Sequence, residues 1–370
     1  MSSVIGFVDL HDEANLGRLT ESRPLGSVTF LGRYGIIDFV LSNFSNSGID
    51  KVQILVPNHF DSLRSHLLNG SVWVRNTKIG YLRPVLNEKG LSNPNQNTDI
   101  SNIVNNIPSS AIDGDYIVVA PSRFLSSMDF NPIIKAHIES GREITVVCTH
   151  TKNGDTEFKG CSEVEIDRDG SIISSHPHVD KKDATISLDT FIFNQQAFFE
   201  MLSFARELSS NYSIKKMVAH FVNNHIAKIN SFIFPGYVVP ILSLRDYVKY
   251  SFDLLNYNKR EKLFLPDWPI YTTTHNTPPA FYGEKSEVSN SFVTNGARIY
   301  GKVKNSIICR DVVVEEGAEV KNSIILSHSV IGSGVTTNYV VTDKDVKIYS
   351  VKEVIGESEC PLFLVKGSEI

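Results

Sequence analysis

Acidic side chains follow the first apolar segment of the chain, at a corner where α/β proteins usually bind phosphate. Residues 4–8 read VIGFV, a buried-strand pattern, and Asp9, His11, Asp12 and Glu13 come just after them. Phosphate at such a corner is held by backbone N–H groups of glycines and by a basic side chain. Two negative charges about 4 Å apart repel by roughly 4 kcal/mol at the effective dielectric of a protein surface. The corner therefore has the wrong charge for a nucleoside triphosphate.

A cation is the alternative ligand for this corner, since His11, Asp12 and Glu13 all carry metal-binding groups. Residues adjacent in sequence on a turn seldom converge on one ion, and a solvated acidic loop needs no partner. We therefore predict no metal site and no cofactor in this chain.

Strand-like and helix-like segments alternate over about the first 256 residues, and they would position this corner. The expected strands are 51–57, 115–121 and 143–150, the expected helices are 37–48 and 131–141, and a hairpin with Asp169 and Gly170 at its turn covers 163–175. Such alternation predicts an α/β fold with a mainly parallel sheet covered by helices on both faces.

The last third of the chain repeats itself. The segment VKNSII occurs at 303–308 and again at 320–325, an offset of 320 − 303 = 17 residues. Apolar residues also recur every six positions, as at Ile308, Val314 and Val320. A six-residue period is typical of a β-helix, in which three faces make one coil of about 18 residues. A β-sandwich would have to produce the literal repeat by accident, so we favour the β-helix.

Composition excludes several classes of function. The 370 residues are 41% hydrophobic and carry a net charge of −5, and the one basic cluster, at 257–262, is isolated, so nucleic-acid binding is not expected. The N-terminus has no basic region, and the apolar stretch 231–242 is broken by prolines, so neither a signal peptide nor a membrane span is expected. The four cysteines lack metal-type spacing. We interpret them as reduced thiols of a cytoplasmic protein.

Two motifs carry a resemblance to a known family. LGRYGIIDF at 31–39, with LSN at 41–43 and NSGI at 46–49, is similar to G-G-K-x-R-I-I-D-F-x-L-S-N-x-x-N-S-G-I. WPIYTTTHNTPPA at 268–280 is similar to W-P-I-x-T…P-P-A. With these motifs and the β-helix in this order, nearly the whole chain resembles ADP-glucose pyrophosphorylase, the glucose-1-phosphate adenylyltransferase of glycogen and starch synthesis.

The resemblance implies a domain plan and a reaction. It implies a nucleotidyltransferase-like α/β domain of the dinucleotide-binding type over 1–256, a linker over 257–283, and a left-handed β-helix with a C-terminal tail over 284–370. Residues after about 339 could form a last coil with a returning strand or a peripheral tail. The family joins ATP to glucose 1-phosphate and releases pyrophosphate, works as tetramers, and uses a divalent metal to neutralise phosphate charge.

The nucleotide loop departs from the family pattern. The family's G-G-x-G-x-R-L falls on residues 10–16, where every glycine and the arginine are missing, so that Leu10, His11, Asp12 and Glu13 stand in their place. The lysine of the following K-P falls on Leu25. The groups that would hold and neutralise the triphosphate are therefore absent from this loop.

The metal and sugar positions depart as well. The family's A-G-D-H falls on residues 120–123, which puts Ser122 at the metal aspartate, and the second aspartate falls near Pro240. The sugar-phosphate lysine falls near His176, and the glycine of S-x-G-I-Y is Asp189. Because every group for metal and phosphate is lost together, the resemblance implies a degenerate site without catalytic residues.

Two arginines suggest what the altered site does instead. Arg123, at the old metal position, could neutralise the acids of the first loop in an arginine–carboxylate cluster, or it could reach solvent. Arg33 stands at the lysine of G-G-K, which the family associates with sugar-phosphate effectors, or it is a surface arginine paired with an acid.

We therefore expect a regulatory, catalytically inactive subunit that forms a hetero-oligomer, a tetramer by the resemblance, with a catalytic ADP-glucose pyrophosphorylase chain. Mg²⁺ would then belong to that catalytic partner. The alternatives are an active sugar nucleotidyltransferase with displaced ligands, and a sugar-phosphate or nucleotide sensor. A β-helix acyltransferase using His328 would leave the large first domain unexplained.

Overall fold

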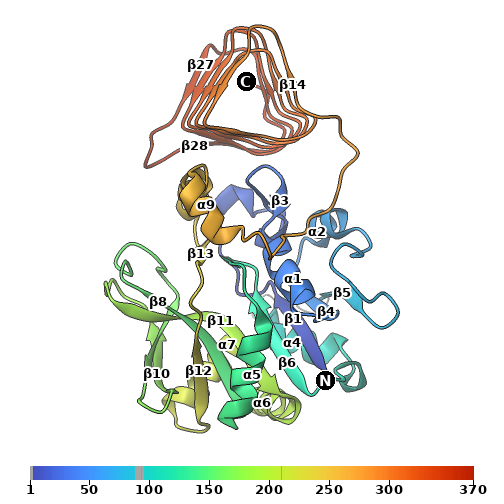
Figure 1. The fold of residues 1–370 in the computed structure, drawn as a ribbon, viewed down its shortest axis with the longest axis vertical. Coiled ribbons are helices and arrows are strands. Elements are labelled where there is room, and N and C mark those ends of the chain that lie inside the picture. The colour runs from blue at the N-terminus through green and yellow to red at the C-terminus, as the bar shows by residue number, and fades with distance from the viewer. Residues whose placement is uncertain (1–2, 88–92, 94–95, 210) are drawn as a thin grey trace.

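The computed structural model describes residues 3–87, 93, 96–209 and 211–370. A nine-stranded sheet organises the first 256 residues, in the order β5-β4-β1-β6-β11-β8-β12-β10-β9 (Figure 1). Its strands are β1 (Val4–Asp9), β4 (Lys51–Val56), β5 (Tyr81–Leu86), β6 (Tyr116–Pro121), β8 (Ile144–Thr151), β9 (Ser162–Ile166), β10 (Ser171–Pro177), β11 (Ala184–Asn194) and β12 (Ile229–Ile233). Two short ladders accompany it, β2 (Thr29–Phe30) with β3 (Tyr34–Gly35), and β7 (Phe124–Leu125) with β13 (Val239–Pro240).

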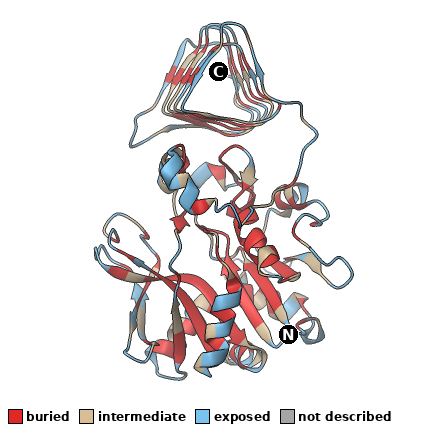
Figure 2. Cartoon of the chain, viewed as in Figure 1, coloured by how far each residue is buried: buried red, intermediate tan, exposed pale blue. Residues whose placement is uncertain are grey.

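Helices cover both faces of this sheet, as the alternation predicts. Apolar side chains of α1 (Ile37–Asn46), α2 (Phe60–Leu67) and α5 (Phe130–Ser140) form one core with the sheet, and those of α4 (Asp99–Asn106), α6 (Gln195–Leu208) and α7 (Ile214–Asn223) form a second core. The central strands are consequently buried along their length (Figure 2). Helices α8 (Leu244–Asp253) and α9 (Tyr257–Leu263) follow, and α9 lies in the segment expected as a linker.

The sheet is parallel in one half only. Strands β5, β4, β1 and β6 are parallel, whereas β11 runs antiparallel to both of its neighbours, β6 and β8. The eleven-residue β11 is the strand that the sequence pattern did not single out. It matters for the site because a bulge between Ser187 and Thr190 interrupts its pairing with β8.

The rest of the chain is a three-sided β-helix. Its sheets are β14 (Phe281–Tyr282), β17 (Arg298–Ile299), β20 (Val313–Val314), β23 (Val330–Ile331) and β26 (Lys347–Ile348); β15 (Glu287–Ser289), β18 (Lys302–Lys304), β21 (Glu319–Lys321), β24 (Thr336–Asn338) and β27 (Glu353–Ile355); and β16 (Phe292–Val293), β19 (Ile307–Ile308), β22 (Ile324–Ile325), β25 (Val340–Thr342) and β28 (Leu362–Leu364). The third of these sheets faces the first domain (Figure 1). The fold class expected from the sequence is confirmed.

The coils are shorter than the expected 18 residues. Arg298 pairs with Val313 and Val313 with Val330, so successive coils repeat after 15 and 17 residues. Corners occupied by residues with positive φ tighten the turns, as at Asn305 and Asn322. The chain beyond 339 forms the last coil and not a peripheral tail, since β28 pairs with β25 and Lys347 bridges to Glu369.

No helix of the described segments has the length and apolar content needed to cross a membrane.

Candidate functional site

The acidic corner and the second metal strand meet at one edge of the sheet. Asp9, the last residue of β1, is in register with Pro121, the last residue of the parallel strand β6. Because parallel strands end at the same edge, the loop after β1 lies beside Ser122 and Arg123. Pro240 joins them, since it pairs with Phe124 in the ladder of β13 and β7. The two expected metal positions, Ser122 and Pro240, are therefore neighbours in space.

Glu13 takes up the hydrogen-bond donors of this edge. Ser122 Oγ donates to Glu13 Oε1, and the Gly26 N–H donates to Glu13 Oε2 at 3.2 Å. Gly26 belongs to the short 3₁₀ turn Leu25–Ser27, in which Leu25 is buried. Burial raises the pKa of the Glu13 carboxyl to about 7, against the smaller lowering effects of Ser122 and Arg123. A carboxylate of the chain itself thus occupies an N–H group that could otherwise face a phosphate.

Arg123 lies buried among acceptors and does not reach solvent. It is 5% exposed, forms an ion pair with Asp189, and also donates to the backbone carbonyl of Asp12. Lys215 Nζ lies 3.0 Å from the same Asp189 carboxylate. The arginine–carboxylate cluster considered from the sequence is therefore present, although Arg123 pairs with the Asp189 carboxylate and not with those of Asp12 or Glu13.

Asp189 retains the backbone conformation of a glycine. Its φ is +47°, and it lies in the bulge of β11. Aspartate tolerates the left-handed region better than most residues, but still at a cost. The pairing with Arg123 and Lys215 compensates for that cost.

The other residues of the corner have local partners. His11 Nδ1 lies 3.2 Å from Asp9 Oδ1, Leu10 is buried, and Asp12 accepts a hydrogen bond of 3.0 Å from Ser213 Oγ. His176 is exposed on β10, and its neighbour Ser175 lines the small cavity described next.

The sugar side of the edge is closed. The cavity lined by Ser175, Ser187, Asp189 and Lys215 has a volume of about 10 Å³. A cavity of this size is at the limit for a single water molecule. By contrast, an open pocket of about 650 Å³ remains beside the first loop, bordered by His11, Glu13, Leu25 and their neighbours.

Sequence reasoning missed three functional-edge residues. Lys215 and Ser213 come from the start of α7, which the pattern gives no reason to place beside residues 12 and 189. Asp99 starts α4 and accepts from the Ile214 N–H at 3.0 Å. Burial, and then the charges of Asp9 and Asp12, raise the pKa of Asp99 well above its usual range. A carboxyl at a helix start was the only signal for it in the sequence.

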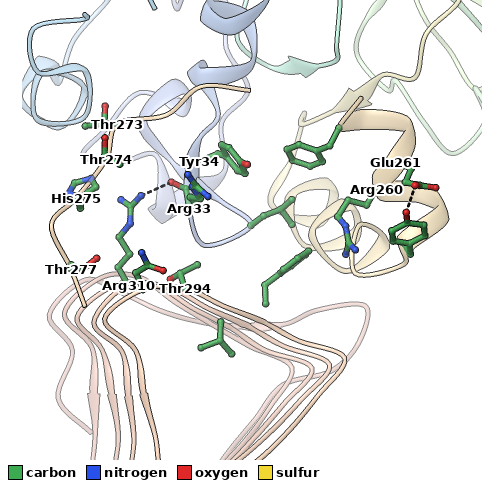
Figure 3. A pocket seen from close by; sticks show the side chains of 16 residues that line it. Arg33, Tyr34, Arg260, Glu261, Thr273, Thr274, His275, Thr277, Thr294 and Arg310 are labelled. Carbon is green, nitrogen blue, oxygen red and sulfur yellow. Dashed lines mark hydrogen bonds between the residues drawn. The ribbon is translucent and has the colours of Figure 1, made fainter. Parts of the chain in front are cut away.

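A second pocket, of about 600 Å³, lies between the first domain and the β-helix (Figure 3). Arg33 from the loop after β2, Arg310 from the β-helix and His275 from the linker gather at one end of it. Arg310 Nη2 donates to the Arg33 carbonyl at 3.2 Å. Threonine hydroxyls line the same end, and the rings of Tyr34, Phe264 and Phe292 border the rest. We refer to this cavity as the interdomain pocket.

The cations of the interdomain pocket are short of counter-ions. Burial, with the charge of Arg33 adding to it, lowers the pKa of Arg310. Burial and then Arg310 lower the pKa of His275. Of the described residues, Arg33 has no carboxylate partner within ion-pair distance; its guanidinium lies 5.7 Å from the centre of the Tyr34 ring. The pocket is therefore suited to an anion.

His328, considered for acyl transfer, is an exposed corner residue with φ of +63°, and its Nδ1 lies 3.7 Å from Asp311. It has no catalytic surroundings among the described residues.

Comparison with known proteins places both parts of the chain. Residues 15–237 match the family described as nucleotidyl transferase, and residues 278–360 match the GlmU-like C-terminal hexapeptide family. The glucose-1-phosphate adenylyltransferase of Fervidobacterium nodosum is 29% identical over 347 residues, which cover 90% of this chain and 81% of the relative. The glycogen biosynthesis protein GlgD of Bacillus subtilis is 29% identical over 359 residues, covering 95% and 92%. The glucose-1-phosphate adenylyltransferase of Clostridium kluyveri is 28% identical over 368 residues, covering 91% and 95%.

Proposed function

Because the chain belongs to the nucleotidyl transferase family and resembles glucose-1-phosphate adenylyltransferases over about nine-tenths of its length, we propose that it is a non-catalytic, regulatory subunit of such an enzyme in glycogen biosynthesis. The catalytic chain would make ADP-glucose and pyrophosphate from ATP and glucose 1-phosphate, and this chain would assemble with it and raise or tune its rate.

The single observation that carries the proposal is the Arg123–Asp189 ion pair. It puts a guanidinium group where the family pattern has a metal carboxylate, and it closes the sugar side to about 10 Å³. Phosphoryl transfer depends on positioning both substrates and neutralising charge on the phosphates. With no room for the sugar phosphate, the chain cannot align an attacking group.

A divalent metal does not fit this edge. Ser122 and Pro240 offer no carboxylate, and Asp189 is already shared by Arg123 and Lys215. Within the described residues, no group of three or more histidine, cysteine, aspartate or glutamate side chains is arranged to hold a metal ion. We therefore assign Mg²⁺ to the catalytic partner, and we disfavour the alternative of an active enzyme with displaced ligands.

The interdomain pocket supports the regulatory part of the proposal. Arg33, Arg310 and His275 form a cationic end with hydroxyl groups around it, which suits a sugar phosphate or another phosphorylated effector. Effector binding in this pocket can bias a partner only if it also changes a contact between the chains. A sensor that binds without turnover is thus a part of this proposal and not a rival to it.

The first coil of the β-helix supports assembly. Tyr282 and Val288 occupy inward positions, in register with Ile299 and Val303 of the next coil, which are buried. In the first coil these positions are 50% and 37% exposed, and its strands pair on one side only. Unpaired edges and apolar ends of repeat structures need a cover. The catalytic chain is the partner that we propose for this end.

Copurification with the catalytic homologue from the same organism tests the proposal. We expect a stable hetero-oligomer that makes ADP-glucose faster than the homologue alone at equal catalytic-chain concentration. The double variant Tyr282→Ser/Val288→Ser should weaken assembly, whereas Val179→Ser, an exposed apolar residue of the first domain, should not. Separate elution of the two chains, with unchanged rates after mixing, would rule the proposal out.

A further inference from the structure

A buried ion pair joins the first loop to the β-helix. Arg23 Nη2 lies 2.8 Å from Asp343 Oδ2, and the two residues are 3% and 2% exposed although they are 320 positions apart. Breaking a buried pair strands the remaining charge in the protein interior, typically at several kcal/mol. The pair therefore fixes the loop residue to one turn of the β-helix.

Apolar contacts reinforce this connection. Leu16, Leu19 and Leu25 of the first loop belong to the same core as the β-helix residues Ile308 and Val341. By contrast, the side chain of Leu10, at the end of β1, packs in the core of the sheet domain. The loop from residue 16 to residue 25 thus packs with the β-helix, while its first residues remain with the catalytic-type edge.

The β-helix end of the ion pair is rigid and borders a cationic cavity. The Asp343 N–H donates to the Leu364 carbonyl at 2.8 Å, and Ser329 Oγ donates to the Asp343 carbonyl at 3.2 Å. The next residue, Lys344, lines a smaller cavity of about 200 Å³ that shares Arg33, His275 and Arg310 with the interdomain pocket. An anion held by the two arginines would therefore also lie near Lys344.

Two cations compete for the Asp343 carboxylate. Burial, and then the charge of Arg23, lower the pKa of Lys344, whereas Asp343 acts in the opposite direction. Arg23 Nη1 is buried and has no hydrogen-bond partner among the described residues. Because Arg23 and Lys344 repel each other, a negative charge on the Lys344 side would relieve Arg23 and strengthen its pair with Asp343.

The loop end of the pair leads back to the altered edge. Arg23 borders the open pocket of about 650 Å³ together with His11 and Glu13, and it lies three residues before Gly26, whose N–H holds Glu13. A change in the position of Arg23 is therefore a change in the wall of that pocket.

We propose that Arg23 is a positioning residue that couples the presence of an anion between the two domains to the conformation of residues 10–25. The inference rests on the proposed function in one respect, that the interdomain pocket takes an anion. An anion there stabilises the Arg23–Asp343 pair and holds the loop; by linkage, a held loop binds the anion more tightly.

Hydrogen exchange of the whole chain, with inorganic phosphate as the probe, tests this coupling. Millimolar phosphate should slow amide exchange in peptides from residues 10–25 about fivefold in the natural chain, a typical size for coupled sites. Arg23→Gln should abolish that response, and Arg23→Lys, which keeps the charge, should retain part of it. Arg18→Gln, an exposed arginine of the same loop, is the matched control and should respond like the natural chain. The response to phosphate, and not the basal rate, is the readout, because a merely structural role would change only the basal rate.

The outcomes separate this inference from the proposed function. Calorimetry with phosphate reports the anion pocket itself, and assembly with the catalytic homologue reports the subunit role. If phosphate binds but the loop does not respond, or if Arg23→Gln responds like the natural chain, Arg23 does not couple the two sites. If Arg23→Gln does not fold, Asp343→Asn provides the second test with the same expected loss. Absence of phosphate binding would overturn both the anion pocket and the coupling, but would leave the assembly proposal standing.

Discussion

At the scale of single residues, the altered edge carries its own charges where the family pattern has bound ones. The Glu13 carboxylate accepts from Ser122 and from the Gly26 N–H, and the Arg123 guanidinium pairs with Asp189. The edge is therefore internally neutralised without phosphate or metal. Both charges are buried, so both should be visible in stability measurements.

The pH dependence of stability should report Glu13. Its pKa is raised from 4.5 to about 7 in the folded chain, so its contribution to stability is fully present below about 4.5 and is lost as the pH rises through about 7. Glu13→Gln removes that loss and should be more stable than the natural chain at pH 8, by up to roughly 3 kcal/mol. The difference should shrink between pH 7 and pH 4.5 in urea denaturation. Glu21→Gln, at an exposed position of the same loop, is the control; a pH-independent difference for Glu13→Gln would contradict the assignment.

Removal of Arg123 should destabilise the first domain. Arg123→Ala leaves the Asp189 carboxylate buried with only Lys215, which should cost about 3–5 kcal/mol of the free energy of unfolding. Asp189→Gly in the same chain removes the stranded charge and the positive-φ strain, and should recover part of the loss. Thermal unfolding of the two single variants and the double variant measures this coupling. Additive effects would mean that the pair is not a unit.

At the scale of elements, the corners of the β-helix form a second polar structure. Asn290, Asn305, Asn322 and Asn338 make a ladder in which each Nδ2 donates to the Oδ1 of the next coil, at 2.9, 2.7 and 2.9 Å. Asn305 and Asn322 also have positive φ. The ladder therefore supplies both the turn conformation and a hydrogen bond between coils.

Substitutions at Asn322 should separate these two roles. Asn322→Gly keeps the ease of positive φ and loses the ladder, at about 1 kcal/mol per lost hydrogen bond. Asn322→Ala loses both and should be less stable by roughly another 1 kcal/mol. The order of melting temperatures should be natural chain, glycine variant, alanine variant. Equal melting temperatures for the two variants would show that the φ requirement contributes nothing.

Much of the architecture could be predicted from sequence, because local periodicity specifies strands, helices and coils. The strands at 51–57, 115–121 and 143–150 and the helix at 131–141 are confirmed as β4, β6, β8 and α5. The direction of β11 could not be predicted, since an apolar run does not encode whether a strand is parallel or antiparallel. The coil length was too long by one to three residues because corner asparagines allow shorter turns.

The site was predictable only in part. The acidic corner and Arg123 could be located because they stand at strand ends whose edge is fixed by parallel pairing. Lys215 and Asp99 could not, since they come from helices whose packing against that edge depends on tertiary contacts. The closed sugar side likewise follows from side chains meeting across distant segments, which no local pattern shows.

At the scale of the whole molecule, the account describes a chain that has kept the framework of its family and changed its site. The interdomain pocket and the open first coil are the two features that face outward to an effector and a partner. Arg33→Gln/Arg310→Gln should leave assembly with the catalytic homologue intact and should remove any response of the complex to a phosphorylated effector. Rates of the complex with and without effector measure this, with Arg298→Gln, an exposed β-helix residue, as the control. A retained response would place the effector site elsewhere.

The most direct test of the central claim is ADP-glucose formation by the purified chain alone, with Mg²⁺, ATP and glucose 1-phosphate. The account predicts no turnover at any metal concentration, because Arg123 and Asp189 close the sugar side and no carboxylates are arranged for a metal. Metal-dependent turnover by the pure chain would contradict it, and would mean that the first-loop acids bind and orient substrates.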